Sequence, residues 1–351
     1  MTEDWTYNRE RVHLSLAGSG DPWSVFTSLR KQILRVLHDY PELDHVSRII
    51  GKPEDEIKRE IEPLIEASLA YKENNLYRPS FLVTNEKETA LVVSQADRIG
   101  SYLADKLLDQ WETIIADINS LEVMERYHIN DIAFFLVGGR LLDIGLLEAL
   151  STTTDLMPQA PPRPSPDRPD AHYYFYMVEG EHENLGKYGQ DETKLLQTGW
   201  YYITFGRNVI DDIPNQPRAD LDEKCSEILN THNNISPDQL GVKLKIPVFN
   251  PSDAETWTNA AARYSSELLG VYGDYQKELL DLHSTLKSGE YAPNSIGEFV
   301  CWFAHVAYCS AIDTLVSAGV MKIPEHRFQA AIWYREREGE GLLYGMSKHN
   351  P

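Results

Sequence analysis

From residue 22 onward, apolar residues recur at intervals of three and four positions, which is the period of one helix face. In the stretch WSVFTSLRKQILRVLHDY they are Val25, Phe26, Leu29, Ile33, Leu34 and Leu37. Pro41 ends this pattern, because proline lacks the N–H that a helix interior needs. A shorter pattern ends at Gly51, and a third runs through KPEDEIKREIEPLIEA, residues 52–67. The spacing predicts three successive helices, with Gly51 as the C-cap of the second.

Two short apolar and aromatic runs follow, in LAYKENNLYRPSFLV, and they flank Glu73-Asn74-Asn75. This pattern predicts a β-hairpin. Helix, short helix, helix, hairpin is the order of a winged helix domain, and residues 22–85 resemble the winged helix-turn-helix of ArsR- and MarR-type bacterial regulators. The spacing similar to that family's core is carried by Leu34, Leu37, Val46, Ile50, Ile57, Ile61, Leu64 and Leu69. Ser68 stands where the family usually has glycine. The resemblance implies a fold more specifically than a function.

Residues 86–119 carry the longest apolar stripe of the first half: Leu91, Val92, Ala96, Ile99, Leu103, Leu107, Trp111, Ile114 and Ile118. A long helix directly after a wing resembles the dimerisation helix of such regulators. The expected alternatives are a homodimer formed through this helix and a helix packed on its own domain. In the next helical pattern, Gly138-Gly139 indicates a break or a close backbone approach.

The proline-rich stretch MPQAPPRPSPDRPD, residues 157–170, is the best candidate for an internal boundary. Two aromatic β patterns follow it, and the last third returns to helix, including a nearly apolar pattern over 296–318. We therefore expect a mostly α fold with minor β, in which an N-terminal winged helix precedes a larger α+β domain. The expected boundaries are an N-terminal extension (1–21), a winged helix domain (22–85), a long helix and helical connector (86–156), a linker or loop (157–170) and an α+β ligand-binding domain (171–351).

Composition limits the classes of partner. The formal net charge is -21, so the chain repels phosphate at long range and needs a local basic patch to bind nucleic acid. No window reaches the roughly 18 uninterrupted apolar residues of a membrane span. The N-terminus lacks a basic start followed by an apolar run. We expect a soluble, cytoplasmic protein with no membrane partner.

The third predicted helix gives conflicting evidence about DNA. Residues 53–67 contain six acids and two bases, whereas side chains that read base edges are usually Arg, Lys, Asn or Gln. The residues expected to contact phosphate are Lys52, Arg59, Lys72 and Arg78. The alternative is a winged helix retained for packing or for binding a protein.

The aromatic runs HYYFYMV (172–178) and GWYYITFG (199–206) are expected to form a paired ribbon. Alternation makes both faces aromatic, so one face is a candidate pocket for a planar or cationic ligand. The candidate ligand-binding residues are Tyr174, Tyr176, Trp200 and Tyr202. The alternative is a sheet buried between helices.

Two clusters of residues are candidates for a metal site or a catalytic site. Cys301, His305 and Cys309 share one helix face and could hold a metal, but their apolar neighbours favour a buried core stripe. EGEHEN, residues 179–184, could hold a divalent ion or supply an acid and a base, but a solvated loop is favoured. GxSxG, P-loop and GxGxxG motifs are missing from the sequence, so it identifies no cofactor and gives no positive evidence for catalysis.

The leading functional hypothesis is a cytosolic transcriptional regulator or small-molecule sensor. The alternative is a protein-interaction or scaffold module whose acidic winged helix does not bind DNA. A third hypothesis is an enzyme whose site forms no recognisable motif.

Overall fold

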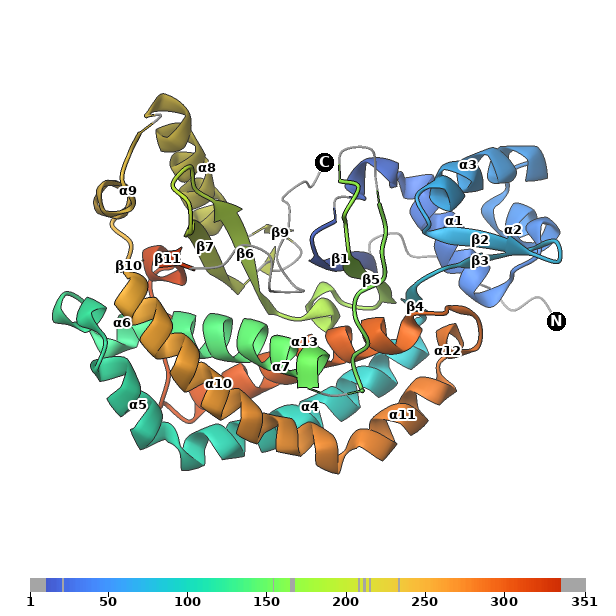
Figure 1. Ribbon diagram of the computed structural model, residues 1–351. Coiled ribbons are helices and arrows are strands. Elements are labelled where there is room, and N and C mark those ends of the chain that lie inside the picture. The colour runs from blue at the N-terminus through green and yellow to red at the C-terminus, as the bar shows by residue number, and fades with distance from the viewer. Residues whose placement is uncertain are drawn as a thin grey trace.

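The computed structural model describes residues 11–335, apart from 21, 154, 165–167, 208, 211–212, 215 and 233. Helices make up 61% and strands 16% of it, so the expected mostly α fold with minor β is confirmed. Figure 1 shows a broad curved layer of helices with small sheets on one side and the N-terminal elements at one end. The C-terminal part of the expected α+β domain, residues 336–351, and residues 1–10 of the expected extension lie outside the described residues.

Residues 22–85, called here the N-terminal module, contain three helices and a hairpin in the expected order. They are α1 (Ser28–Asp39), α2 (Leu43–Ile50), α3 (Glu54–Glu66), β2 (Ala70–Glu73) and β3 (Leu76–Pro79). Gly51 caps α2 with a left-handed φ of 72°. Asn74 and Asn75, at φ 49° and 66°, form the hairpin turn, which requires positive φ at both residues. Ser68 has a φ of 58°, which explains why glycine would suit this position. The resemblance to ArsR- and MarR-type regulators stays a prediction.

A three-stranded sheet separates the module from the rest of the chain. Its order is β1 (Val12–Gly18), β5 (Tyr173–Glu179), β4 (Leu82–Thr84), with β1 antiparallel and β4 parallel to β5. Alternate residues of β5 face opposite sides: Tyr173, Phe175 and Met177 join the module's core, whereas Tyr174, Tyr176 and Val178 join the main core. This sheet is therefore a wall shared by two apolar cores.

The sheet corrects two of the expected boundaries. Residues 12–18 form strand β1 and not an irregular extension, because β5 offers them a complete partner. The proline-rich residues 157–170 do not separate two cores, since β5, which follows them, completes the sheet beside the module. Arg163, inside this stretch, is itself buried. Residues 165–167 of the stretch are outside the described part.

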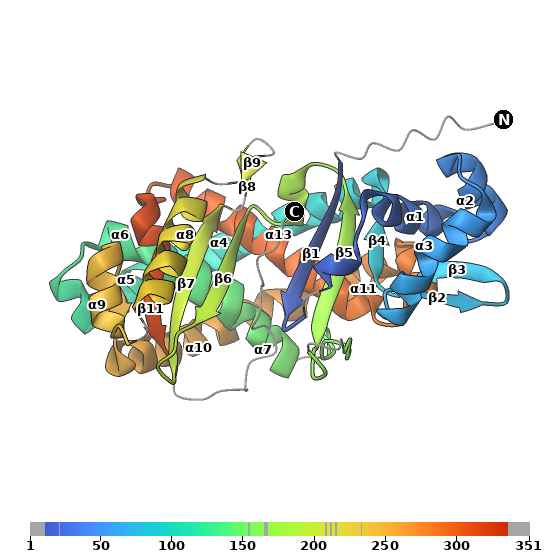
Figure 2. The same ribbon diagram turned by 90° about the horizontal axis from the view of Figure 1, so that it is seen from above.

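A second sheet lies beside the first on the same side of the helical layer, as Figure 2 shows. Its strands, in spatial order, are β10 (Val248–Phe249), β11 (Ala330–Tyr334), β7 (Trp200–Arg207) and β6 (Tyr188–Lys194). A short ribbon pairs β8 (Val209–Ile210) with β9 (Ile213–Pro214), and the helices α8 (Gln216–Thr231) and α9 (Pro237–Leu244) follow. The expected ribbon of residues 172–178 with 199–206 is wrong, because β7 pairs with its neighbour β6 and β5 pairs with β1.

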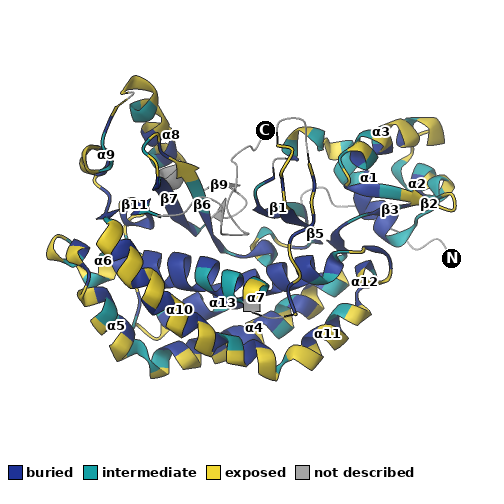
Figure 3. Cartoon of the chain, viewed as in Figure 1, coloured by how far each residue is buried: buried dark blue, intermediate teal, exposed yellow. Residues whose placement is uncertain are grey.

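The helical layer is built around α13, whose residues are almost all buried (Figure 3). Its members are α4 (Glu86–Asp109), α5 (Trp111–Asn119), α6 (Ile129–Ala133), η4 (Phe134–Gly145), α7 (Leu146–Thr153), α10 (Pro251–Asp274), α11 (Gln276–Thr285), α12 (Ser288–Tyr291) and α13 (Ser295–Ser317). Short 3-10 turns are η2 (Trp23–Val25), η3 (Glu122–Glu125), η5 (His182–Leu185) and η6 (His326–Gln329).

The long helix expected over 86–119 is two helices, α4 and α5, which meet at Gln110. The apolar stripe of α4 packs along α13 in the same chain. At Gly100 an added Cβ would lie 2.4 Å from the carbonyl oxygen of Ala307, so the two helices approach closely. Packing on its own chain accounts for this stripe apart from Leu91, which is 52% exposed, and the homodimer stays a prediction.

Helix α13 is long and apolar enough, by length and composition alone, to cross a membrane. However, 78% of its apolar window is buried inside the protein. Core helices of soluble proteins pass the same test, so this helix is weak evidence for a membrane span.

The element η4 is a π-helix, and its Gly138 and Gly139 lie against the ring of Phe205 in β7. This confirms the close backbone approach expected of the two glycines. A Cβ at Gly138 would lie 2.3 Å from Cε1 of Phe205. We expect Gly138→Ala to lower the free energy of unfolding by about 1–3 kcal/mol, because the ring is held in a packed core. Urea denaturation measures the change.

The matched control is Gly270→Ala in α10, where nothing lies within 4 Å of an added Cβ. Alanine there should be neutral, or stabilise the helix by about 0.5–1 kcal/mol. Equal effects of the two substitutions would contradict the close packing of η4 on Phe205.

Candidate functional site

The exposed side of α3 is the part of the module that would face a partner. Ile57, Ile61 and Leu64 are fully buried in the module's core. The exposed residues of the helix are Glu54, Asp55, Lys58, Arg59, Glu62 and Glu66. Four carboxylates against two cations make this face unfavourable for the phosphates of a duplex.

Each of the four residues expected to contact phosphate is already engaged within the chain. Nζ of Lys52 lies 2.8 Å from the carboxylate of Glu56. Nε of Arg59 donates to the carbonyl of Asp55 at 3.3 Å, within the same helix. These two cations, with Lys72, are on the surface.

The other two stack on aromatic rings. Lys72 lies over the ring of Tyr77, with 5.3 Å between Nζ and the ring centroid. Arg78 is half-buried, and its guanidinium lies 5.2 Å from the ring centroid of Tyr291. Arg78 is thus turned toward the helical layer, and phosphate would have to compete with these contacts.

The four expected ligand-binding aromatics do not form one site. Tyr174 and Tyr176 are fully buried in the main core, and the hydroxyl of Tyr174 donates to the carbonyl of Pro158 at 2.8 Å. Tyr202 lies in a separate core, where it donates to Asp222 at 3.0 Å. Trp200 packs beside that core against Tyr334. These four residues do not line one pocket, because β5 and β7 belong to different sheets.

Cys301, His305 and Cys309 form the buried stripe that their apolar neighbours favoured. Nδ1 of His305 lies 2.8 Å from the carbonyl oxygen of Cys301, so this nitrogen carries a proton. Burial raises the pKa of the Cys301 thiol well above its usual value, which makes it a poor nucleophile. Among the described residues, no group of three or more His, Cys, Asp or Glu side chains lies so that it could hold a metal ion.

The acids of EGEHEN pair with arginines. Glu181 lies 3.0 Å from Arg11, and Glu183 pairs with Arg207. Glu179 lies 2.7 Å from Arg35. The segment therefore ties neighbouring elements together through two exposed ion pairs and one largely buried ion pair.

Asp143 and Glu298 are buried, and the sequence patterns did not predict the burial of either acid. Asp143 in η4 accepts from the amide of Gln190 at 2.9 Å, and burial raises its pKa to about 6 although His305 opposes the rise. Glu298 in α13 pairs with Arg163 at 2.8 Å, and burial raises its pKa to about 7. A charged residue within the apolar pattern of 296–318 was the available signal for Glu298.

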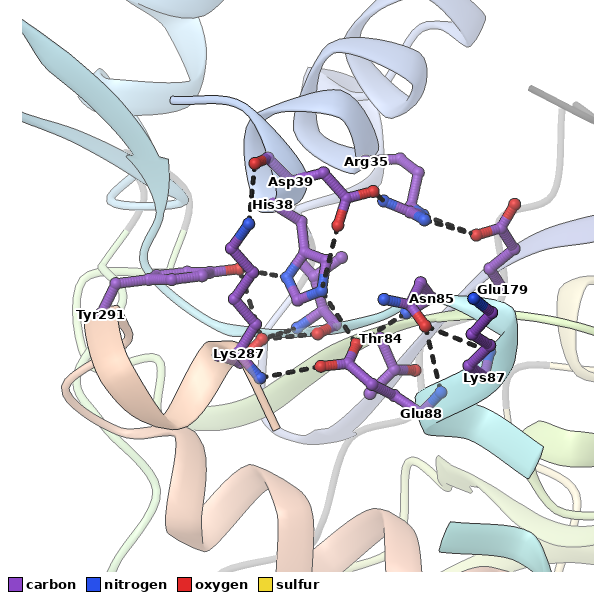
Figure 4. A network of polar contacts seen from close by, with 12 residues as sticks. Arg35, His38, Asp39, Thr84, Asn85, Lys87, Glu88, Glu179, Lys287 and Tyr291 are labelled. Atoms are coloured by element: carbon purple, nitrogen blue, oxygen red, sulfur yellow. Dashed lines mark hydrogen bonds and ion pairs between the residues drawn. The ribbon is translucent and has the colours of Figure 1, made fainter. Parts of the chain in front are cut away.

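Beneath the module, a polar network joins α1 to the helical layer (Figure 4). Its centre is His38, which is fully buried. Nε2 of His38 lies 2.9 Å from the carboxylate of Glu88, and Nδ1 lies 2.8 Å from the hydroxyl of Tyr291. The same carboxylate accepts from the backbone amides of Asn85 at 2.9 Å and Lys287 at 2.7 Å. Glu88 thus connects α1, the start of α4 and the segment before α12.

The charge of Glu88 is stabilised where it lies. Burial by itself would raise the pKa of its carboxyl group. The hydrogen bond and the charge of His38, together with the two backbone amides, outweigh burial and hold the pKa below its usual value. The carboxylate therefore acts as an acceptor at neutral pH.

A second branch of the network holds the C-terminal end of α1. Arg35, only 3% exposed, lies 2.6 Å from Asp39 and 2.7 Å from Glu179 of β5. Nζ of Lys287 donates to the carbonyl of Asp39 at 2.7 Å. Sequence patterns could not predict this network, because residues in contact within it are separated by as many as 253 positions.

We compared the chain with models of protein families, with curated proteins and with solved structures, and none of the three comparisons returned a match.

Proposed function

We propose that this chain is a cytosolic protein-interaction module whose acidic third helix binds a polypeptide partner and does not bind DNA. The observation that carries the proposal is the exposed side of α3, with Glu54, Asp55, Glu62 and Glu66 against only two cations. A groove-reading helix approaches two phosphate strands, and four carboxylates there would be repelled. The net charge of -21 acts in the same direction.

The partner that suits this surface is a polypeptide with basic or hydrogen-bond-donating side chains. Opposite charge on the partner would speed its association and orient it on the helix. The intramolecular contacts of Lys52 and Arg59 leave carboxylates as the dominant charges at this face.

The second candidate is a transcriptional regulator that binds DNA through the same module. Two observations favour it: the order of three helices and a hairpin, and the surface position of Lys52, Arg59 and Lys72. In that hypothesis the hairpin and the start of α3 contact phosphate.

A duplex-binding experiment separates the two candidates. We expect the wild-type protein to show no salt-dependent binding to a fluorescent DNA duplex, even at low salt. The double variant Glu62→Lys/Glu66→Lys should gain binding, with a slope of log affinity against log salt of about -2, one for each new cation that meets a phosphate. Fluorescence anisotropy at low and moderate salt measures both.

The matched control, Glu223→Lys/Glu255→Lys, makes the same change in net charge at exposed positions of α8 and α10. Wild-type binding that weakens with salt and is lost in Lys52→Ala would overturn the proposal in favour of the regulator. A photo-crosslinker placed at Glu62 tests the partner directly. We expect it to capture a polypeptide that a crosslinker at Glu255 does not, and recovery of nucleic acid would favour the regulator.

A further inference from the structure

A short segment of the helical layer contacts four elements of the N-terminal module: α1, β2, β3 and β4. The segment, called here the clasp, consists of Lys287 and the four residues of α12, Ser288–Tyr291. Lys287 binds Asp39 at the end of α1, and Tyr291 binds His38 one residue earlier. The clasp thus holds the C-terminal end of α1 from below.

The same segment holds the hairpin β2–β3. The hydroxyl of Tyr71 in β2 donates to the carbonyl of Tyr291 at 2.6 Å. Arg78 in β3 lies over the ring of Tyr291. The two strands of the hairpin therefore meet one residue of the clasp through a hydrogen bond and a cation–π contact.

A third contact joins the clasp to β4. The hydroxyl of Ser288 donates to the carbonyl of Val83 and accepts from the amide of the same residue at 2.9 Å. Ser288 is fully buried, so these bonds are shielded from water. Among the described residues, no strand pairs with β4 on the side away from β5. Ser288 makes there the two backbone hydrogen bonds that a residue of a neighbouring strand would make.

Some of the hydrogen atoms in these bonds can be assigned. The carboxylate of Glu88 only accepts, so Nε2 of His38 carries a proton. The hydroxyl of Ser288 gives its proton to the carbonyl of Val83. The hydroxyl of Tyr291 lies 2.8 Å from Nδ1 of His38 and 3.3 Å from the hydroxyl of Ser288.

The apolar packing of the module does not depend on the clasp. Ile57, Ile61 and Leu64 of α3 pack in the module's own core with residues of β5. Ala70 at the base of the hairpin lies in that core, as does Tyr77, which pairs with Lys72, whereas residues 72–75 are exposed. Loss of the clasp would therefore loosen the hairpin and the end of α1 before it unfolded α3.

We propose that Lys287–Tyr291 is a clasp that immobilises the hairpin and the end of α1 on the helical layer, and that its release frees both while the module's core stays folded. The clasp lies between α11 and α13, so a movement of these helices reaches the hairpin through it. The inference concerns the mobility of the module and stands whether its partner is a protein or DNA.

Amide hydrogen exchange tests the clasp in the full chain. In Tyr71→Phe and in Ser288→Ala, we expect amides of β2 and β3 to exchange about tenfold faster, the factor that one buried hydrogen bond contributes. Amides of Ile57–Leu64 in α3 should keep their wild-type rates. The matched control is Tyr127→Phe, which removes a bond from a tyrosine hydroxyl to the carbonyl of Ile246 elsewhere in the fold.

Two results would overturn the clasp. Unchanged exchange in the hairpin of both variants would mean that the contacts do not restrain it. Equal acceleration in the hairpin and in α3 would mean that they stabilise the whole module and hold no separate part. Tyr71→Phe removes a single hydroxyl at a half-buried position, so it provides the test even if Ser288→Ala does not fold.

Discussion

Replacing Glu298 by alanine is expected to lower the free energy of unfolding by about 3–5 kcal/mol, because the substitution leaves the buried charge of Arg163 without its partner. The two side chains are 0% and 2% exposed, and 2.8 Å separates their charged atoms. The amide of Leu82 also loses its acceptor, which lies 2.7 Å away. Urea denaturation of the two proteins at constant pH measures the difference.

The double variant Glu298→Leu/Arg163→Leu is the informative control. It removes both charges, so it should be less destabilised than the sum of the two single variants. A loss of less than about 1 kcal/mol in Glu298→Ala, the size expected of an exposed pair, would contradict the buried ion pair.

The same carboxyl group gives a pH dependence with a defined sign. Burial raises the pKa of Glu298 from 4.5 to about 7 in the folded protein, so the folded state holds a proton that the unfolded state has lost. The contribution of this carboxyl group to the free energy of unfolding is fully present below pH 4.5 and is lost as the pH rises through about 7. Glu298→Gln should lose this part of the dependence, while the part due to Asp143, whose pKa is raised to about 6, remains.

Trp302→Ala is expected to be comparably destabilising, by about 3–5 kcal/mol, because it empties the volume of a fully buried indole. Trp302 lies in α13, packs beside the ring of Tyr176 and donates from Nε1 to the carbonyl of Asn184 at 2.6 Å. Its removal therefore affects the contact between the central helix and the shared sheet. The shift of the urea midpoint at constant slope is the measurement.

Trp302→Phe separates volume from hydrogen bonding. It keeps most of the apolar contact and loses the bond to Asn184, so its cost should be well below that of the alanine variant. Similar losses in the two variants would show that the hydrogen bond, and not the packed volume, dominates at this position.

Local patterns predicted the local elements of this fold. The helices of the module follow from apolar spacing, Gly51 from its cap position, and the hairpin from the two apolar and aromatic runs that flank residues 73–75. The apolar spacing of residues 296–318 identified the central helix for the same reason. In each case the determining residues lie within one element.

Pairing between distant segments could not be predicted in the same way. Strand β5 pairs with β1, which is about 160 positions earlier, and its aromatic residues alone do not specify that partner. Strand β7 pairs with β6, its neighbour in the chain, and not with β5 as its aromatic composition had suggested. The ligand residues inferred from that ribbon fail for the same reason.

The candidate site likewise has features that the local sequence predicts and features that depend on distant contacts. The acidic character of α3 could be read from Glu54, Asp55, Glu62 and Glu66, because helical periodicity determines which residues are exposed. That Arg78 turns inward depends on Tyr291, more than 200 positions later. The network around His38 requires the folded chain to exist before its members meet.

The shared sheet has a consequence for how the protein is made. Its central strand, β5, begins at residue 173, whereas its edge strands β1 and β4 end at residues 18 and 84. At typical synthesis rates, β1 waits about 10–30 s for its partner after it is translated. During that time the newly made module lacks Tyr173, Phe175 and Met177 of its own core. The N-terminal module, although first in the chain, therefore completes its folding only after half of the protein has been synthesised, and chaperones have a defined interval in which to protect it.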